Sequence, residues 1–299
     1  MPEDFAPIVP APLCAGARVA VIAPAGPCNR ALVFRGLGWL AEHYKVEFDP
    51  DLFERAGYLA GSDERRLAEL ERRLADPGLA AILVARGGFG LTRIVERADF
   101  GALRRHPKWL VGFSDATALH VEGLRAGVAT LHAANVGGLG QGDAHARESF
   151  RRALEAPRAP RELGGLACWT PGRARGPLVG GNLSLLAACA SGGRLRVPHG
   201  AVLALEDVTE SAYRVDRLLT SLFSAGCFDA IAGVVVGDFT DCAPSGGAGV
   251  ESVLREKLSA LRVPVLAGLH FGHGAQNEPL PFGLPAALDG ARGTLTLGV

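Results

Sequence analysis

A serine at the junction of a predicted strand and a predicted helix is the sharpest chemical signal in the sequence. Ser114 lies in Gly112–Ala116 (GFSDA), between the apolar run Lys108–Phe113 and a helical stretch from Ala116 to Arg125. Parallel α/β sheets place their sites at the carboxyl ends of strands, and backbone N–H groups of the next helix can stabilise an oxyanion there. The stretch is typical of a nucleophile elbow, with alanine in place of its last glycine. Capping of the helix by Ser114 is the structural alternative.

A glycine-rich turn follows another buried strand. Residues 86–90 (RGGFG) come directly after the apolar run Leu79–Ala85. Glycines allow the backbone to approach a ligand closely. The G-x-G-x-x-G spacing is absent and the pattern is not a Walker loop, so we predict no nicotinamide cofactor. An ordinary strand-to-helix turn and a phosphate site both stay open as alternatives.

Three acids follow the predicted strand Ala201–Leu205. Glu206 would extend from the end of this strand, on the face opposite Leu203 and Leu205. Asp207 would point the other way. Glu210 lies near a helix that begins around Tyr213, where an acid stabilises the helix N-terminus. We therefore expect a chemical role for Glu206 and a structural one for Glu210, against the alternative that all three acids lie in a solvated loop.

Two histidines lie three positions apart at the ends of a Gly-containing stretch. His270 and His273 form an H-x-x-H pair in residues 270–274 (HFGHG). No glutamate follows at the usual helical spacing, and a Gly-rich loop does not hold two histidines on one helix face. We predict no metal site here and no metal cofactor.

The elements that must position these residues alternate between strand and helix. Strands are predicted at 18–23, 45–48, 79–85 and 108–113, with helices at about 29–43, from Ser62 to residue 75, and at 116–125. Ser62 reads as a helix N-cap followed by Asp63 and Glu64 in the first turn. Further strands are predicted at 231–236 and 294–297, and further helices at about 213–225 and 250–261. Alternation of this kind implies βαβ units and a mostly parallel sheet.

The chain is expected to form two domains. Residues 143–176 are rich in Arg, Pro and Gly and weakly periodic, so we predict a linker there. The N-terminal domain would then span 1–142 and carry the nucleophile. The C-terminal domain would span 177–299 and carry Glu206 and His273.

The composition excludes several classes of protein. The 299 residues are 48% hydrophobic and 21% charged, and 31 basic residues balance 31 acidic ones. We expect no nucleic-acid or membrane partner, and a small substrate instead. The six cysteines show no C-x-x-C spacing, which favours reduced thiols. The first residues carry acids and prolines without an apolar region of the kind found in signal peptides, so a cytoplasmic location is expected.

Taken in order along the chain, these motifs resemble the LD-carboxypeptidase family of serine peptidases, which includes muramoyl-tetrapeptide carboxypeptidases and microcin C immunity carboxypeptidases. This sequence departs from the family pattern at Phe89 and Phe113, where Tyr is more usual. The matching stretches are the Pro24 turn, 58–65 (YLAGSDER), 85–90 (ARGGFG), 112–119 (GFSDATAL), 180–184 (GGNLS), 205–207 (LED), 213–217 (YRVDR) and 272–274 (GHG).

The resemblance implies an α/β fold, with an N-terminal parallel-sheet α/β sandwich and a C-terminal, more β-rich α/β domain. It implies a homodimer and a Ser–Glu–His triad, which maps onto Ser114, Glu206 and His273. The backbone N–H groups of Asp115 and Gly88 would form the oxyanion hole. The leaving residue carries a free carboxylate, for which we predict a substrate-binding site at Arg86 and Gly87.

The function implied is release of the terminal D-alanine from murein tetrapeptides in cell-wall recycling, without a cofactor. A microcin-type immunity peptidase that cleaves aminoacyl-nucleotide conjugates is the alternative within the family. A non-catalytic two-lobed binding protein is the alternative from another class. A cysteine-dependent amidotransferase would need Cys at the elbow, where this chain has Ser114.

Overall fold

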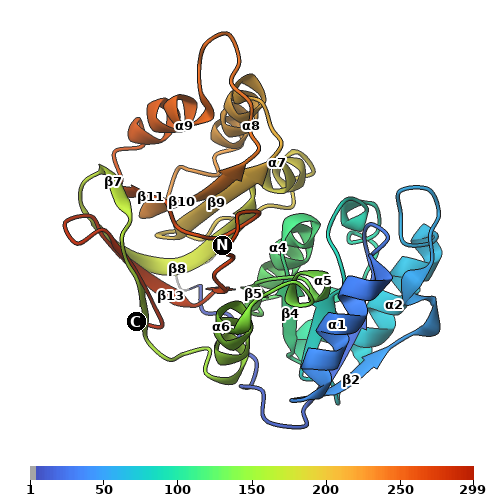
Figure 1. Cartoon of the computed structure of the whole chain (residues 1–299). Coiled ribbons are helices and arrows are strands. Elements are labelled where there is room, and N and C mark those ends of the chain that lie inside the picture. Colours follow the sequence, from blue (N-terminus) through green and yellow to red (C-terminus); the bar gives the residue numbers. More distant parts are fainter. Residues whose placement is uncertain (1–4) are drawn as a thin grey trace. The chain divides into compact units, whose positions relative to one another are not determined.

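The computed structural model describes residues 5–299, which divide into two compact units (Figure 1). The N-terminal unit contains residues 7–157 together with 279–281. The C-terminal unit contains residues 158–278 and 282–299, with Phe5 and Ala6. Each unit is built on its own sheet, and each carries part of the predicted site.

The N-terminal unit is built on a six-stranded sheet with the order β12-β5-β4-β3-β1-β2. The strands from β5 to β2 pair in parallel. Strands β3 and β4 are buried throughout, as expected of strands covered on both faces. The strands are β1 (Arg18–Ile22), β2 (Lys45–Phe48), β3 (Ala81–Val84), β4 (Trp109–Gly112), β5 (Thr130–His132) and β12 (Leu280–Phe282).

In this unit α1 packs against α5, and α3 packs against both α2 and α4. Local sequence explains where they begin: Ser62 Oγ accepts a hydrogen bond from Arg65 N at the start of α2, as its capping pattern predicts. The helices are α1 (Arg30–Ala41), α2 (Asp63–Ala75), α3 (Phe100–Arg105), α4 (Thr117–Arg125), α5 (Val136–Leu139) and α6 (Ala144–Glu155). Short 3₁₀ segments lie at Pro50–Phe53, Leu91–Arg93 and Ser114–Ala116.

The C-terminal unit is built on an eight-stranded mixed sheet with the order β6-β14-β13-β8-β9-β10-β11-β7. Strands β8 to β11 are parallel, and the strands at both ends pair antiparallel. The strands are β6 (Arg161–Leu163), β7 (Ala167–Thr170), β8 (Arg173–Asn182), β9 (Val202–Val208), β10 (Gly233–Thr240), β11 (Val265–Ala267), β13 (Pro285–Asp289) and β14 (Thr294–Leu297).

Three helices of the C-terminal unit lie along the side of its parallel strands in Figure 1, with α8 packed against both α7 and α9. They are α7 (Leu183–Ser191), α8 (Ala212–Ser224) and α9 (Val250–Ser259). No helix in residues 5–299 combines the length and the hydropathy of a membrane span.

The predicted fold class is confirmed: a mostly parallel α/β unit precedes a unit with more strands. Two local predictions need correction. Strand β9 runs to Val208, so Glu206 and Asp207 lie within the strand and not beyond an end at Leu205. Both are buried, which excludes the alternative of a solvated loop for these two acids. Residues 143–176 hold α6, β6, β7 and the start of β8, so this segment is folded; the predicted domain boundaries themselves stay a prediction.

Candidate active site

Ser114 occupies the backbone conformation that a nucleophile elbow requires. It follows β4 by two residues and precedes α4, with φ at +66°. A serine rarely adopts positive φ, because its Cβ crowds the neighbouring carbonyl, and such strain gathers at functional sites. A residue that only capped α4 would have no need of this conformation. The side chain is half-buried at the carboxyl end of the parallel sheet.

The glycine-rich loop presses directly against this serine. An ideal Cβ on Gly87 would lie 2.9 Å from Ser114 Cβ and 3.1 Å from its Oγ, so no larger residue fits without a shift. Gly88 follows with φ at +104°. The backbone of residues 86–90 therefore lies beside the Ser114 hydroxyl, within the same unit.

Asp115 ties the two segments together. Its side chain is fully buried, and its Oδ2 accepts a hydrogen bond from Leu91 N at 2.8 Å, at the end of the glycine-rich loop. Burial raises the pKa of Asp115 to about 6, against an opposing effect of the Leu91 hydrogen bond. This carboxyl thus fixes the loop relative to the serine.

A buried arginine of α2 braces the other side of the loop, and the sequence patterns did not single it out. Arg66 is fully buried, and its Nη1 donates to Gly90 O at 2.9 Å and to Pro24 O at 2.5 Å. The turn after β1 is joined to the loop a second time, because Gly26 N donates to Gly87 O at 3.1 Å. The sequence feature that could have identified Arg66 is a charged residue on the apolar face of α2, one position before Leu67.

Glu206 and His273, the two side chains predicted to work together, are in contact in the C-terminal unit. His273 Nδ1 lies 2.7 Å from Glu206 Oε2. The Glu206 side chain is fully buried, and the imidazole is 18% exposed. Burial raises the pKa of Glu206, and the hydrogen bond from His273 opposes that rise. A buried carboxylate bonded to Nδ1 fixes the orientation of the imidazole ring. Nε2 is then the ring nitrogen that is not bonded to Glu206.

A glycine makes this contact possible. Gly272 has φ at +109°, and an ideal Cβ on it would lie 2.4 Å from Glu206 Oε2. Gly272 N also donates to Asn277 Oδ1 at 3.0 Å, which holds the histidine loop. The loop backbone therefore packs against the carboxylate that orients His273.

Asp207 has a different set of partners, as the alternation along β9 predicts. It accepts hydrogen bonds from Asn182 Nδ2 at 2.8 Å and from Ser184 Oγ at 2.7 Å, at the start of α7. Glu210 lies 3.4 Å from Ser184 Oγ and 3.7 Å from the Arg214 guanidinium. Both acids thus stabilise local structure.

The two histidines of the H-x-x-H pair face different carboxylates. His270 Nδ1 lies 3.9 Å from Asp238 Oδ1, whereas His273 is bonded to Glu206. The pair therefore does not act as a joint set of ligands in this arrangement.

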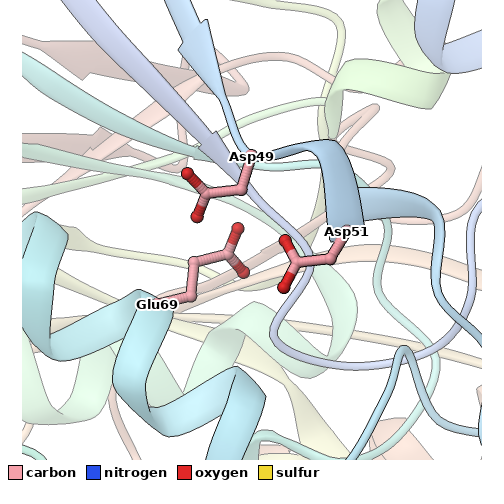
Figure 2. Close-up of side chains that lie close together, drawn as sticks. All are labelled: Asp49, Asp51 and Glu69. Atoms are coloured by element: carbon pink, nitrogen blue, oxygen red, sulfur yellow. The ribbon is translucent and has the colours of Figure 1, made fainter.

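A cluster of three acids lies elsewhere in the N-terminal unit, where Asp49, Asp51 and Glu69 bring carboxylate oxygens within 4.8 Å of one another (Figure 2). Guanidinium groups already balance them: Arg65 pairs with Asp51 and Glu69 at 3.1 Å, and Arg73 pairs with Asp49 at 3.0 Å. The cluster is an ion-pair network that joins α2 to the segment after β2, and we assign no metal to it.

Arg86 lies next to the loop glycines, and its Nη1 donates to Pro27 O at 2.7 Å. This residue is exposed and lines a cavity of about 460 Å³ beside Phe113. The structure therefore leaves Arg86 accessible to a ligand near Ser114.

Known proteins resemble the chain over nearly its whole length. A carboxypeptidase-like protein of Streptomyces coelicolor is 41% identical over 96% of this chain and 95% of its own length. The murein tetrapeptide carboxypeptidase of Pseudomonas aeruginosa is 34% identical over 92% of this chain and 94% of its own. The crystal structure of muramoyltetrapeptide carboxypeptidase from Oxalobacter formigenes superimposes with a TM-score of 0.85 and 28% identity, covering 94% of this chain and 99% of that one.

Family models match both units. The model of the LD-carboxypeptidase N-terminal domain matches residues 19–133, and that of the LD-carboxypeptidase C-terminal domain matches residues 175–288. With these matches and the relatives above, the chain belongs to the LD-carboxypeptidase family of enzymes.

Proposed function

We propose that this enzyme is a serine-type LD-carboxypeptidase that releases the terminal D-alanine from a murein tetrapeptide, with Ser114 as nucleophile and Glu206 and His273 as its partners. The observation that carries the proposal is the 2.7 Å contact between His273 Nδ1 and the buried Glu206 carboxylate. The strained backbone of Ser114 supports it from the other unit. The printed names of the Pseudomonas and Oxalobacter relatives support the murein substrate.

The proposed reaction has two steps. His273 takes the proton from Ser114 Oγ as this oxygen attacks the scissile carbonyl carbon, and the C–N bond then breaks as His273 protonates the leaving amine of D-alanine. A water molecule, deprotonated by His273, hydrolyses the resulting ester and frees Ser114. Glu206 keeps the imidazole in the required tautomer and stabilises its charged form.

Two backbone N–H groups, of Asp115 and Gly88, would stabilise the oxyanion. Asp115 directly follows Ser114, and Gly88 follows Gly87, whose backbone lies beside the Ser114 side chain. Arg86 and Gly87 would contact the leaving residue. We also propose that the enzyme is a homodimer, as the family resemblance implies. We further propose that it acts in the cytoplasm, the location expected from its sequence.

The first test is the nucleophile. Ser114→Ala should lower kcat by about 10⁴-fold or more without a change in thermal midpoint, because the acyl-enzyme cannot form. A fluorophosphonate should label Ser114 in the wild-type protein. Ser191→Ala is the control, since Ser191 Oγ donates to Ala187 O within α7. Activity within about tenfold of wild type in Ser114→Ala would remove this serine from the mechanism.

The second test is the substrate. A diaminopimelate-containing tetrapeptide should release D-alanine, and its all-L counterpart should react much more slowly. Faster cleavage of aminoacyl-nucleotide conjugates would assign the enzyme to immunity instead. A folded protein that forms no fluorophosphonate adduct would favour a non-catalytic binding protein.

A further inference from the structure

The cavity next to the nucleophile turn carries an unbalanced positive charge. It encloses about 460 Å³, and among the described residues that line it Arg55 and Arg86 are the two that carry charge. No carboxylate of residues 5–299 lines the cavity, so the two guanidinium groups favour an anionic ligand. Its volume suits a small organic group.

The cavity lies at the sheet edge that carries Ser114. Ala85 and Phe113, which directly follow β3 and β4, line it together with Asn135, which comes shortly after β5. All lining residues belong to the N-terminal unit. Phe113 is the residue before Ser114, so the cavity adjoins the turn that carries the proposed nucleophile.

Helix α1 adds to the attraction for an anion. Its N-cap Asn29 lines the cavity, and the Asn29 side chain accepts a hydrogen bond from Leu32 N at 3.2 Å. The positive end of the helix dipole lies at this terminus. Arg86 is held beside the cavity by its bond to Pro27 O, which uses one of the five N–H donors of the guanidinium.

We propose that this cavity binds the free carboxylate of the leaving residue, and that Arg55 acts with Arg86 as its second cation. The inference rests on the proposed function. In a carboxypeptidase substrate the carboxylate carbon is separated from the scissile nitrogen by a single carbon atom, so its binding site must lie close to the nucleophile. The cavity adjoins the Ser114 turn through Phe113 and Arg86, so binding there would couple recognition of a chain end to the position of the scissile bond.

The kinetic experiment compares the tetrapeptide with its C-terminal carboxamide. Arg55→Gln and Arg86→Gln should each raise KM for the free acid by about tenfold or more, since hydrogen bonds to charged groups are lost, and should leave KM for the amide unchanged. Arg30→Gln is the matched control, because Arg30 lies over the Phe53 ring and does not line the cavity. Equal effects on both substrates would overturn the proposal.

A second measurement does not depend on turnover. Cys28 lines the cavity, so alkylation of its thiol by anionic iodoacetate can be compared with alkylation by neutral iodoacetamide, with the exposed Cys14 as reference. The iodoacetate preference should be greater at Cys28 than at Cys14, should fall in Arg55→Gln and Arg86→Gln, and should persist in Arg30→Gln. Free D-alanine should protect Cys28 and D-alaninamide should not.

These two readouts separate the possible failures. If the enzyme proved inactive on tetrapeptides while the Cys28 preference and protection held, the proposed function would fail and the carboxylate site would stand. If the enzyme were active but Cys28 showed the same preference as Cys14 in every variant, the carboxylate site would be refuted.

Discussion

At the scale of single residues, neighbouring acids on β9 have different tasks because side chains alternate along a strand. Glu206 is bonded to His273, whereas Asp207 accepts hydrogen bonds from the start of α7. The sequence predicted this division from the alternation. It missed that β9 continues through both acids and buries them.

Glu206→Gln should therefore lower kcat strongly, by about 10⁴-fold, because the neutral amide no longer stabilises imidazolium and can favour the wrong tautomer. Glu210→Gln is the matched control and should cost less than about 1 kcal/mol of stability with little loss of rate. Measurement of kcat and thermal midpoint on both variants decides the assignment. A dead Glu210→Gln beside an active Glu206→Gln would show that the wrong acid has been chosen.

Asp115 gives a pH-dependent prediction. Its pKa is raised to about 6 in the folded protein, so the stability linked to its protonated form is fully present below the unfolded pKa of about 4 and is lost as pH rises through 6. Asp115→Asn keeps an oxygen for Leu91 N and does not titrate. Between pH 4 and pH 7, the free energy of unfolding of wild type should fall by about 2 kcal/mol relative to the variant.

Urea unfolding at a series of pH values measures this difference. Burial also raises the pKa of Glu69, to about 7, but that group is present in both proteins and cancels. Parallel pH profiles for the two proteins would mean that Asp115 is ionised in the folded state without penalty.

At the scale of elements, most positions follow from local patterns. The β-rich runs predicted β1 to β4 to within two residues at each end, and the Ser62 cap fixed the start of α2. Helix α6 was missed, because its apolar face is limited to Phe150, Ala153 and Leu154 in an Arg-rich stretch. The side-chain bonds between elements could not be predicted, since they join residues far apart in sequence.

The brace formed by Arg66 is the clearest case of such a bond. Arg66→Lys keeps the charge but loses the planar guanidinium, whose Nη1 donates to Pro24 O and Gly90 O while its Nη2 donates to Asp63. The glycine-rich loop should then lose its fixed position beside Ser114, so kcat should fall by about tenfold or more with little change in KM. The pH profile of kcat should keep its shape, because no titrating group of the proposed triad is altered.

Arg93→Lys is the matched control for this variant. Arg93 binds the same Asp63 at 2.8 Å from a more exposed position, with 42% of its side chain accessible. It should leave kcat unchanged. Equal kcat for Arg66→Lys and wild type, at a lowered thermal midpoint, would limit Arg66 to a structural role.

At the scale of the whole molecule, the chain does not divide at a single point. Strand β12 comes from near the C-terminus yet lies beside β5 in the N-terminal sheet, and residues 279–281 group with that unit. A short strand such as Leu280–Phe282 gives no local sign in the sequence of its distant partner. The N-terminal sheet is therefore completed only after most of the C-terminal unit has been made.

This arrangement predicts that a substitution near the C-terminus loosens a strand almost 150 residues earlier. Leu280 is fully buried in β12, so Leu280→Ala should cost about 2–5 kcal/mol and weaken the cover that β12 gives to the edge of β5. Hydrogen exchange measured by mass spectrometry should rise in the peptide that contains β5 (Thr130–His132). Leu288→Ala is the matched control, because Leu288 is equally buried but lies in β13 of the other sheet. This control should raise hydrogen exchange in β8 and β14 and leave exchange in β5 unchanged. If both variants raised exchange everywhere to the same extent, the two sheets would unfold as one cooperative structure. Strand β12 would then have no special effect on β5.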